Sequence, residues 1–322
     1  MNAAVLNEMG QTPRYREFDE PEAGEDRVLV EVLAAGLKPL DRQLASGAHY
    51  GSQSWKLPAI CGTDGVGRLA DGGRVLFARA HPPFGAFAGR TVVNPALCFP
   101  IPDGVDDCTA AAVFNPGLSA WASLAWRARM EKGESVLILG ATGVTGKLAV
   151  QEAKMLGAGR VTAAGRNERV LASLPELGAD VTIRLAGSRQ EMAEAFARAA
   201  RERPFDVVID YLWGEPVEAL LDSMTRDDLM PAGSRTRLVQ AGESAGATIA
   251  LRGSALRGSR VEILGAGSGS APPAHMWAPA ADNLLTAVAE GRLRIEIVRT
   301  PLADVESVWN RATPGARIVL IP

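Results

Sequence analysis

The chain has 322 residues, of which 47% are hydrophobic and 22% charged, a composition typical of a globular protein with about two domains. Its formal net charge of −3 leaves no basic surplus for binding a nucleic-acid backbone. The three cysteines form no CxxC pair and the three histidines form no HExxH motif, which excludes a disulfide framework and a four-cysteine zinc lobe. We therefore expect no protein-built metal site. No apolar run reaches the roughly 18 residues of a membrane span, and the first residues lack a signal-peptide pattern, so a cytoplasmic enzyme is expected.

Residues 1–112 are rich in glycine and proline and contain short apolar runs at 27–36, 73–80 and 89–95. Short strands at such spacing predict a compact β barrel or sandwich. Asp103 and Gly104, next to two prolines, mark a loop before the following element.

From about residue 113 the pattern changes, and alanine-rich helical segments alternate with short apolar runs. The runs predicted as buried strands are 135–139, 160–164, 205–210, 237–241 and 261–265. The helices predicted between them cover 144–156, 167–177, 188–201 and 215–225. Buried strands that alternate with helices indicate an α/β fold with a parallel, doubly wound sheet and right-handed crossovers.

The last part of the chain predicts one helix at 277–290 and two strands near 294–299 and 317–321. We expect no helix between these strands that would extend a parallel sheet. The tail is therefore assigned to the first domain, which gives one domain from 1–112 and 271–322 and a second from 113–270.

Three glycines follow the first strand of the second domain. Gly140, Gly143 and Gly146 lie at GxxGxxG spacing between a predicted strand and a predicted helix, which is the context that a dinucleotide-binding fingerprint requires. Glycines let the backbone approach a pyrophosphate, and the helix N-terminus supplies N–H donors. We therefore predict a Rossmann domain in which Thr142, Gly143 and Val144 contact the cofactor.

The end of the second predicted strand indicates which nicotinamide cofactor binds. An NAD site places an acidic residue there, on the ribose hydroxyls. This chain instead has Arg166 and Asn167, and its first acid, Glu168, is already on the next helix. An arginine can form a bidentate pair with a 2′-phosphate, so the sequence favours NADPH, with Arg166 and Asn167 as its ligands.

Nearly the whole chain resembles the medium-chain dehydrogenase/reductases. The resemblance rests on the glycine loop near position 140 behind a β-rich domain, and on the tail at 284–322. Zinc-binding alcohol dehydrogenases of this family carry a cysteine ligand and then a GHE motif. Here the stretches 36–43 and 62–67 place Lys38 near the cysteine position and Thr63-Asp64 in place of His-Glu. The chain therefore resembles the zinc-independent quinone oxidoreductases.

This resemblance implies a GroES-like catalytic domain, formed by 1–112 and 271–322, beside the Rossmann domain. It implies hydride transfer from NADPH to a quinone without a metal. It also implies a homodimer formed through the strand near Val261–Gly265, which would be an exposed sheet edge. Two alternatives stay open: an NADPH-dependent reductase of enone, enal or enoyl-thioester double bonds, and a protein that binds NADPH without turnover.

The resemblance also identifies site residues. Tyr50 and Lys38 are the catalytic candidates: Tyr50 could donate a proton after hydride transfer or only line the cleft, and Lys38 could polarise a carbonyl, carry a surface charge or pair with Asp41. Asp64 is expected to accept bonds from backbone donors. The residues placed at the cofactor are Thr63, Asn115, Ser119, Asp210, Gly242, Gly265, Gly267 and Ser268.

Overall fold

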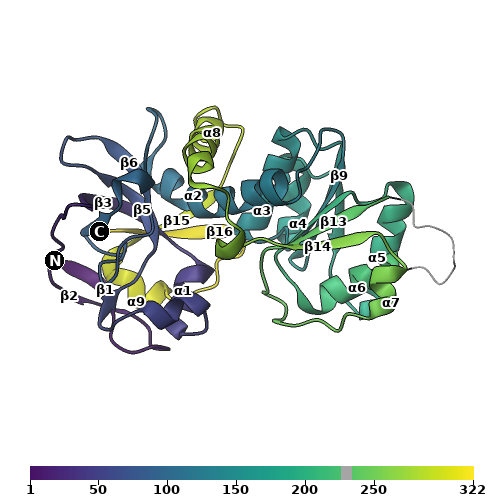
Figure 1. The fold of residues 1–322 in the computed structure, drawn as a ribbon, viewed down its shortest axis with the longest axis horizontal. Helices are drawn as coiled ribbons and strands as arrows, with labels where there is room; N and C mark the ends of the chain where they lie inside the picture. The colour runs from purple at the N-terminus through teal and green to yellow at the C-terminus, as the bar shows by residue number, and fades with distance from the viewer. Residues whose placement is uncertain (226–233) are drawn as a thin grey trace. The chain divides into compact units, whose positions relative to one another are not determined.

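In the computed structural model, which describes residues 1–225 and 234–322, the chain divides into two compact units (Figure 1). Unit 1 comprises Met1–Asn115 and Ala278–Pro322, and unit 2 comprises Pro116–Trp277. Helix α2 (Asp107–Trp121) crosses this boundary, so the change in sequence pattern near residue 113 falls inside a helix. Among the described helices, none is long and apolar enough to cross a membrane.

Unit 2 is built on a six-stranded parallel sheet with the order β11-β10-β9-β12-β13-β14. Counted from β9, the order is 3-2-1-4-5-6, that of a Rossmann dinucleotide-binding domain, so the predicted doubly wound sheet is confirmed. The strands in chain order are β9 (Ser135–Leu139), β10 (Arg160–Gly165), β11 (Val181–Arg184), β12 (Val207–Asp210), β13 (Thr236–Gln240) and β14 (Val261–Gly265).

The sequence pattern did not predict β11. This strand lies at the edge of the sheet, and only Ile183 of its four residues is buried. The central strands are buried along their whole length and therefore show as continuous apolar runs, whereas a polar edge strand does not.

Helices cover both faces of this sheet (Figure 1). One face packs against α3 (Val144–Met155), α4 (Glu168–Ser173) and a π-helical segment (Ala122–Arg127) that continues α2. The other face packs against α5 (Arg189–Glu202) and α6 (Gly214–Met224), and a short α7 (Gly253–Arg257) follows β13. The predicted helix at 167–177 is shorter than expected: α4 ends at Ser173 and a 3-10 turn (Leu174–Leu177) continues it, because Pro175 has no N–H for the helix.

Unit 1 contains two sheets and confirms the β-rich first domain. A seven-stranded sheet has the order β15-β16-β3-β5-β6-β8, with β7 also paired to β3, and a three-stranded sheet has the order β2-β1-β4. The strands are β1 (Asn2–Leu6), β2 (Arg14–Glu17), β3 (Val28–Leu37), β4 (Ala59–Ile60), β5 (Asp64–Arg68), β6 (Arg74–Ala78), β7 (Arg90–Val93), β8 (Cys98–Pro100), β15 (Glu296–Pro301) and β16 (Ala316–Ile321). The helices α1 (Pro39–Ser46) and α8 (Trp277–Ala289) are among those that accompany these strands.

The expectation that no helix separates the last two strands is wrong. β15 pairs with β16 in parallel, and a 3-10 turn (Leu302–Asp304) and α9 (Val305–Val308) connect them. Parallel neighbours need a crossover rather than a tight turn, and this short helical segment provides it. β16 then pairs antiparallel with β3, which incorporates the tail into the sheet of unit 1.

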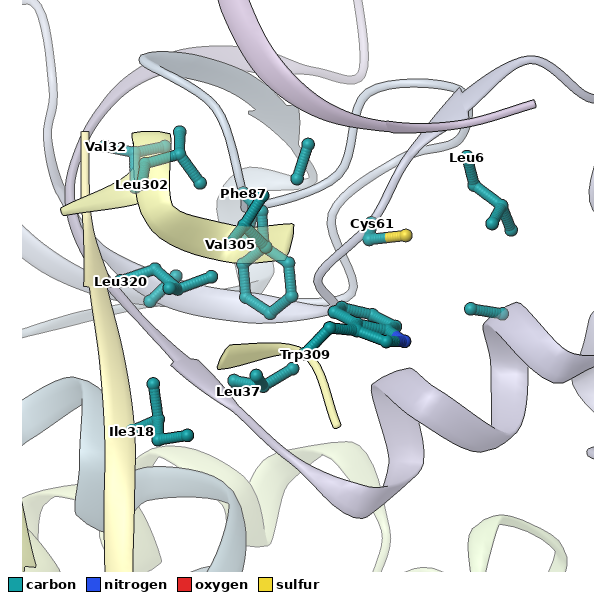
Figure 2. Close-up of a cluster of buried hydrophobic side chains, with 14 of the residues drawn as sticks. Leu6, Val32, Leu37, Cys61, Phe87, Leu302, Val305, Trp309, Ile318 and Leu320 are labelled. Atoms are coloured by element: carbon teal, nitrogen blue, oxygen red, sulfur yellow. The ribbon is translucent and has the colours of Figure 1, made fainter. Parts of the chain in front are cut away.

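The core of unit 1 joins the first and last parts of the chain (Figure 2). Phe87 and Trp309 meet edge to face, with ring centroids 6.4 Å apart and planes at 82°. Ile318 and Leu320 of β16 are each 1% exposed in the same cluster. Figure 2 also shows that the indole nitrogen of Trp309 is turned away from Phe87 and Leu320.

Candidate functional site

Most of the predicted cofactor residues follow the carboxyl ends of the unit 2 strands. The register places Asp210 beside Leu139 and also beside Gln240, and Gln240 lies beside Gly265, so the last residues of four strands are in line. In open α/β sheets ligands bind outside this edge. We call it the strand-end edge.

The glycine loop between β9 and α3 is closely packed. A Cβ on Gly146 would lie 2.3 Å from the backbone oxygen of Gly140 and 2.6 Å from Ala141 Cα, so only glycine allows α3 to approach the loop this closely. Gly140 has a φ of +84°, which also favours glycine. At Gly143, which precedes α3, an added Cβ would meet only the Gly140 oxygen, at 3.4 Å. The loop therefore leaves space beside the N-terminal N–H groups of α3, next to Thr142 and Val144.

Cationic side chains gather where β10 and β11 end. Arg166 is exposed directly after β10. Arg184 ends β11 in register with Gly165, and its Nη1 lies 2.5 Å from Glu168 Oε1. Asn167 caps α4, because its Oδ1 accepts a 3.1 Å bond from Val170 N. The sequence argument missed Arg184, which could have been found only by predicting β11.

Asp210 stabilises the loop that follows its own strand. Its carboxylate is fully buried, and Oδ1 accepts bonds from the backbone N–H groups of Leu212, at 2.8 Å, and Trp213, at 3.1 Å. Burial raises the pKa of Asp210 to about 6, although these N–H groups oppose the shift. Trp213 has a φ of +54°, a strained conformation for a residue other than glycine, and the Asp210 contact helps to maintain it.

The loops after β13 and β14 complete the strand-end edge. A Cβ on Gly242 would lie 2.8 Å from the backbone oxygen of Tyr211, whereas Gly265 and Gly267 have open space around them. Ser268 begins a 3-10 turn, Ser268–Ser270, beyond β14. Two side chains that the sequence did not single out stabilise this turn, because Ser270 Oγ and Arg127 Nε donate to Gly265 O at 3.0 Å and 2.7 Å.

In unit 1 the central feature is a buried ion cluster at the start of α1. Lys38 is 2% exposed, and its Nζ lies 3.2 Å from Asp41 Oδ2 and 3.1 Å from Asp64 Oδ1. The same nitrogen donates to Gly36 O at 3.0 Å, so its three N–H groups have three acceptors. The predicted pairing with Asp41 is confirmed, and the surface-charge alternative is wrong. To polarise a substrate carbonyl, the amine would have to leave these partners.

Thr63 connects the two carboxylates of this cluster. Its Oγ1 lies 3.2 Å from Asp41 Oδ1 and 3.2 Å from Asp64 Oδ2. The expectation that Asp64 accepts from backbone donors is wrong, because its partners among the described residues are the side chains of Lys38 and Thr63. Burial raises the pKa of Asp64, and the neighbouring Lys38 opposes that shift.

Tyr50 lies in the turn after α1 and is 66% exposed. Its ring stacks on His49, with centroids 4.1 Å apart, and His49 Nδ1 accepts a 3.0 Å bond from Gly51 N. The phenol is therefore accessible to a ligand. The other two predicted residues, Asn115 and Ser119, are half-buried and one helical turn apart on α2.

Comparison with known proteins agrees with this architecture. The zinc-binding dehydrogenase family matches residues 144–271. The trans-enoyl reductase pgmF of Aspergillus terreus is 30% identical over 203 residues, which cover 58% of this chain and 55% of pgmF, so the match spans just over half of that relative. The probable NADPH-dependent quinone reductase tdiC of Emericella nidulans is 26% identical over 96% of both chains. The structure of Escherichia coli quinone oxidoreductase, complexed with NADPH, has a TM-score of 0.85 over 100% of both chains at 22% identity.

The 3-2-1-4-5-6 sheet, the separate β-rich unit and these matches agree with one another: the chain is similar to the medium-chain dehydrogenase/reductases, and its residues 144–271 match the zinc-binding dehydrogenase family. The resemblance to the quinone oxidoreductases found in the sequence is confirmed as a similarity, in sequence to tdiC and in fold to the Escherichia coli protein.

The family description names zinc, but the ion cluster does not fit that metal. The Lys38 ammonium lies between the two carboxylates, where it supplies the positive charge itself. Over residues 1–225 and 234–322, no group of three His, Cys, Asp or Glu side chains is placed to bind a metal ion. We therefore derive no step that uses zinc. The strand-end edge, in contrast, fits a dinucleotide, because Gly146 lets α3 pack closely against the loop and Gly143 leaves the backbone open to a pyrophosphate.

Proposed function

We propose that the chain is an NADPH-dependent reductase that transfers hydride to a quinone. The observation that carries the proposal is the strand-end edge, where the closely packed glycine loop lies on the same edge as Arg166 and Arg184. A dinucleotide would place its pyrophosphate on the N-terminus of α3 and its 2′-phosphate near the two arginines. When bound, NADPH would supply the hydride.

We assign the two roles to the two units. Unit 2 is the Rossmann dinucleotide-binding domain, with Thr142, Gly143 and Val144 at the pyrophosphate, and Asp210 and Gly242 in the loops that shape the rest of the site. Unit 1 is the GroES-like catalytic domain, with Thr63 and Tyr50 facing the reactants. The remaining cofactor contacts are assigned to Asn115, Ser119, Asn167, Gly265, Gly267 and Ser268.

Two features support the quinone as substrate. tdiC, which is a probable NADPH-dependent quinone reductase, matches the chain over 96% of both lengths. The Lys38 amine is also occupied by carboxylates, which leaves it no free N–H to polarise a substrate. Quinone reduction has little need for such a group, because the oxygen anion it forms is stable and water can protonate it. Orientation of the reactants then supplies most of the rate enhancement.

A second candidate is reduction of a double bond conjugated to a carbonyl. The 30% identity with the trans-enoyl reductase pgmF favours it. That reaction places a proton on carbon, so the exposed hydroxyl of Tyr50 would act as the general acid.

A substrate panel with the purified chain tests both candidates. We expect NADPH oxidation with benzoquinones and naphthoquinones, and less with enones, enals or enoyl thioesters. A clear preference for enoyl thioesters would replace the quinone proposal with the second candidate. Binding of NADPH without turnover of any substrate in the panel would contradict both and support the non-catalytic alternative.

We also propose a homodimer formed through β14. This strand is at the edge of the parallel sheet and pairs only with β13 among the described strands. An unpaired edge can add a strand from a second copy. Light scattering at micromolar concentration should give twice the mass of the chain, and a mass near 34 kDa would contradict the proposal.

A further inference from the structure

A pocket of about 290 Å³ opens on unit 1 and shares no lining residue with the site proposed above. Its walls are the loop at residues 10–12, one face of α1 from Arg42 to Ser46, and Trp309 with Asn310 after α9. Gly10 N donates to Ala45 O at 2.8 Å, which ties the loop to the helix. The walls therefore belong to one connected structure rather than to loose surface segments.

The pocket contains a cation that has few partners. Arg42 lines it, and the one described bond of its guanidinium is from Nη2 to Arg311 O, at 3.3 Å. Its Nε is shielded from solvent and has no hydrogen-bond partner among the described residues. Partial burial lowers the pKa of Arg42, so an anion beside it would restore part of the lost solvation.

The neighbouring acids do not neutralise this arginine. Asp41, the adjacent residue, raises the pKa of Arg42 by its charge, but by less than burial lowers it, and the Asp41 carboxylate is bonded to Lys38 and Thr63. Three cations lie close to two carboxylates here, namely Lys38, Arg42 and Arg317 close to Asp41 and Asp64. The five charges sum to +1. Lys38 and Arg317 are buried, so Arg42, which lines the pocket, is the cation that a ligand in the pocket can reach. Gln11, which lines the pocket, donates from its Nε2 to Glu8 at 2.7 Å.

Trp309 adds a neutral donor on the opposite wall. Figure 2 shows its indole nitrogen turned away from Phe87 and Leu320, and its N–H makes no hydrogen bond to any part of the chain that the structure describes. Ala45 and the indole edge, which belong to residues only 1% and 4% exposed, add a small apolar surface to the pocket. The pocket thus offers the guanidinium of Arg42, the N–H of Trp309 and a small apolar surface. These groups match a planar monoanion with a short apolar body.

We propose that this pocket binds a small organic carboxylate, with its two oxygens on the Arg42 guanidinium and its body against Trp309. The site is independent of the proposed reductase activity.

Benzoate is the probe, and benzamide is its uncharged isostere. Calorimetric titration and tryptophan fluorescence of the full chain should show saturable binding of benzoate, at least about tenfold tighter than that of benzamide. The affinity should fall as salt is added, because the contact is partly exposed. Absence of saturable benzoate binding at millimolar concentration, or equal binding of the two probes, would overturn the proposal.

Three variants locate the binding. Arg42→Gln should weaken benzoate binding by about ten- to a hundredfold, since it removes the charged donor. Gln43→Glu changes an exposed position on the same wall and should weaken binding by repulsion, so it tests the site even if Arg42→Gln does not fold. Arg166→Gln removes an exposed cation in unit 2 and should leave benzoate binding unchanged. Binding that survives both pocket variants, or that is lost in Arg166→Gln, would place the anion elsewhere and contradict the proposal.

Discussion

The strand-end edge of unit 2 and the ion cluster of unit 1 are polar regions built on different principles. At the edge, Gly146 and Gly242 lie where a Cβ would collide with backbone atoms, so the absence of side chains defines the shape. In the cluster, the Lys38 ammonium pairs with the carboxylates of both Asp41 and Asp64, and all three side chains are buried. A substitution at the edge should therefore lower stability by forcing backbone atoms apart. A substitution in the cluster should lower it by leaving a buried charge unpaired, and that loss should depend on pH.

The largest effect is expected for Lys38→Met. It leaves two buried carboxylates without their cation, and breaking a buried pair in this way costs about 3–5 kcal/mol of unfolding free energy. Without Lys38 the pKa of Asp64, already raised by burial, should rise further. The folded state then binds a proton that the unfolded state has lost, so stability falls as the pH rises, and the deficit should be smaller at pH 5 than at pH 8.

Urea unfolding of the wild type and of Lys38→Met at pH 5 and pH 8 measures the loss of unfolding free energy at each pH. As the matched control, Lys38→Met combined with Asp64→Asn should recover part of the loss, because one of the two unpaired charges is removed. A deficit below about 1 kcal/mol, or one that does not depend on pH, would show that the cluster does not depend on its charges.

The edge is tested by Gly146→Ala. The new Cβ would lie 2.3 Å from Gly140 O, so α3 must move away from the loop, and we expect about 1–3 kcal/mol of destabilisation together with weaker NADPH binding. Gly143→Ala is the matched control for stability, since its Cβ meets the same oxygen at 3.4 Å. Thermal unfolding should therefore separate the two variants. Equal loss of stability in both would mean that close packing at position 146 is not what the loop requires.

Arg166→Ala tests how the edge selects its cofactor. We expect kcat/KM for NADPH to fall about ten- to a hundredfold and that for NADH to change little, because a charge-assisted pair with the 2′-phosphate is lost. Arg184→Ala should have a smaller effect, since that side chain is already bound to Glu168. Equal losses with both cofactors would show that Arg166 does not recognise the phosphate.

These two regions also differ in how far the sequence predicted them. Five of the six strands of unit 2 and its glycine loop were predicted, because buried strands and glycine spacing are local patterns, whereas the polar edge strand β11 was not. The ion cluster was only partly predicted: Asp41 lies three residues from Lys38, whereas Asp64 lies 26 residues away and reaches it through the sheet. Arg127 was missed for the same reason, because its contact with Gly265 spans 138 residues. Periodicity carries no information about such contacts.

The smallest effect is expected for Tyr50→Phe. If quinones are the substrate, kcat/KM should stay within about twofold, because water can protonate the product anion. If an enone is the substrate, the variant should lose activity more strongly at high pH, where fewer hydronium ions and protonated buffer molecules can replace the phenol as proton donor. Steady-state rates with one quinone and one enone, each measured from pH 6 to 9, distinguish these outcomes. A large loss with the quinone would assign Tyr50 a role beyond proton donation.

The position of β16 has a consequence for the order in which the chain can fold. β16 lies between β15 and β3, inside the seven-stranded sheet, and Arg317 on it donates to Leu37 O at 2.9 Å. All of unit 2 is translated before β16, so during synthesis the Rossmann domain can become complete while the sheet of unit 1 still lacks an interior strand. Until the ribosome releases residues 316–321, β3 has an unpaired edge and the core around Ile318 and Leu320 is open. β3, which precedes unit 2 in the chain, thus depends for its pairing on a strand that follows unit 2.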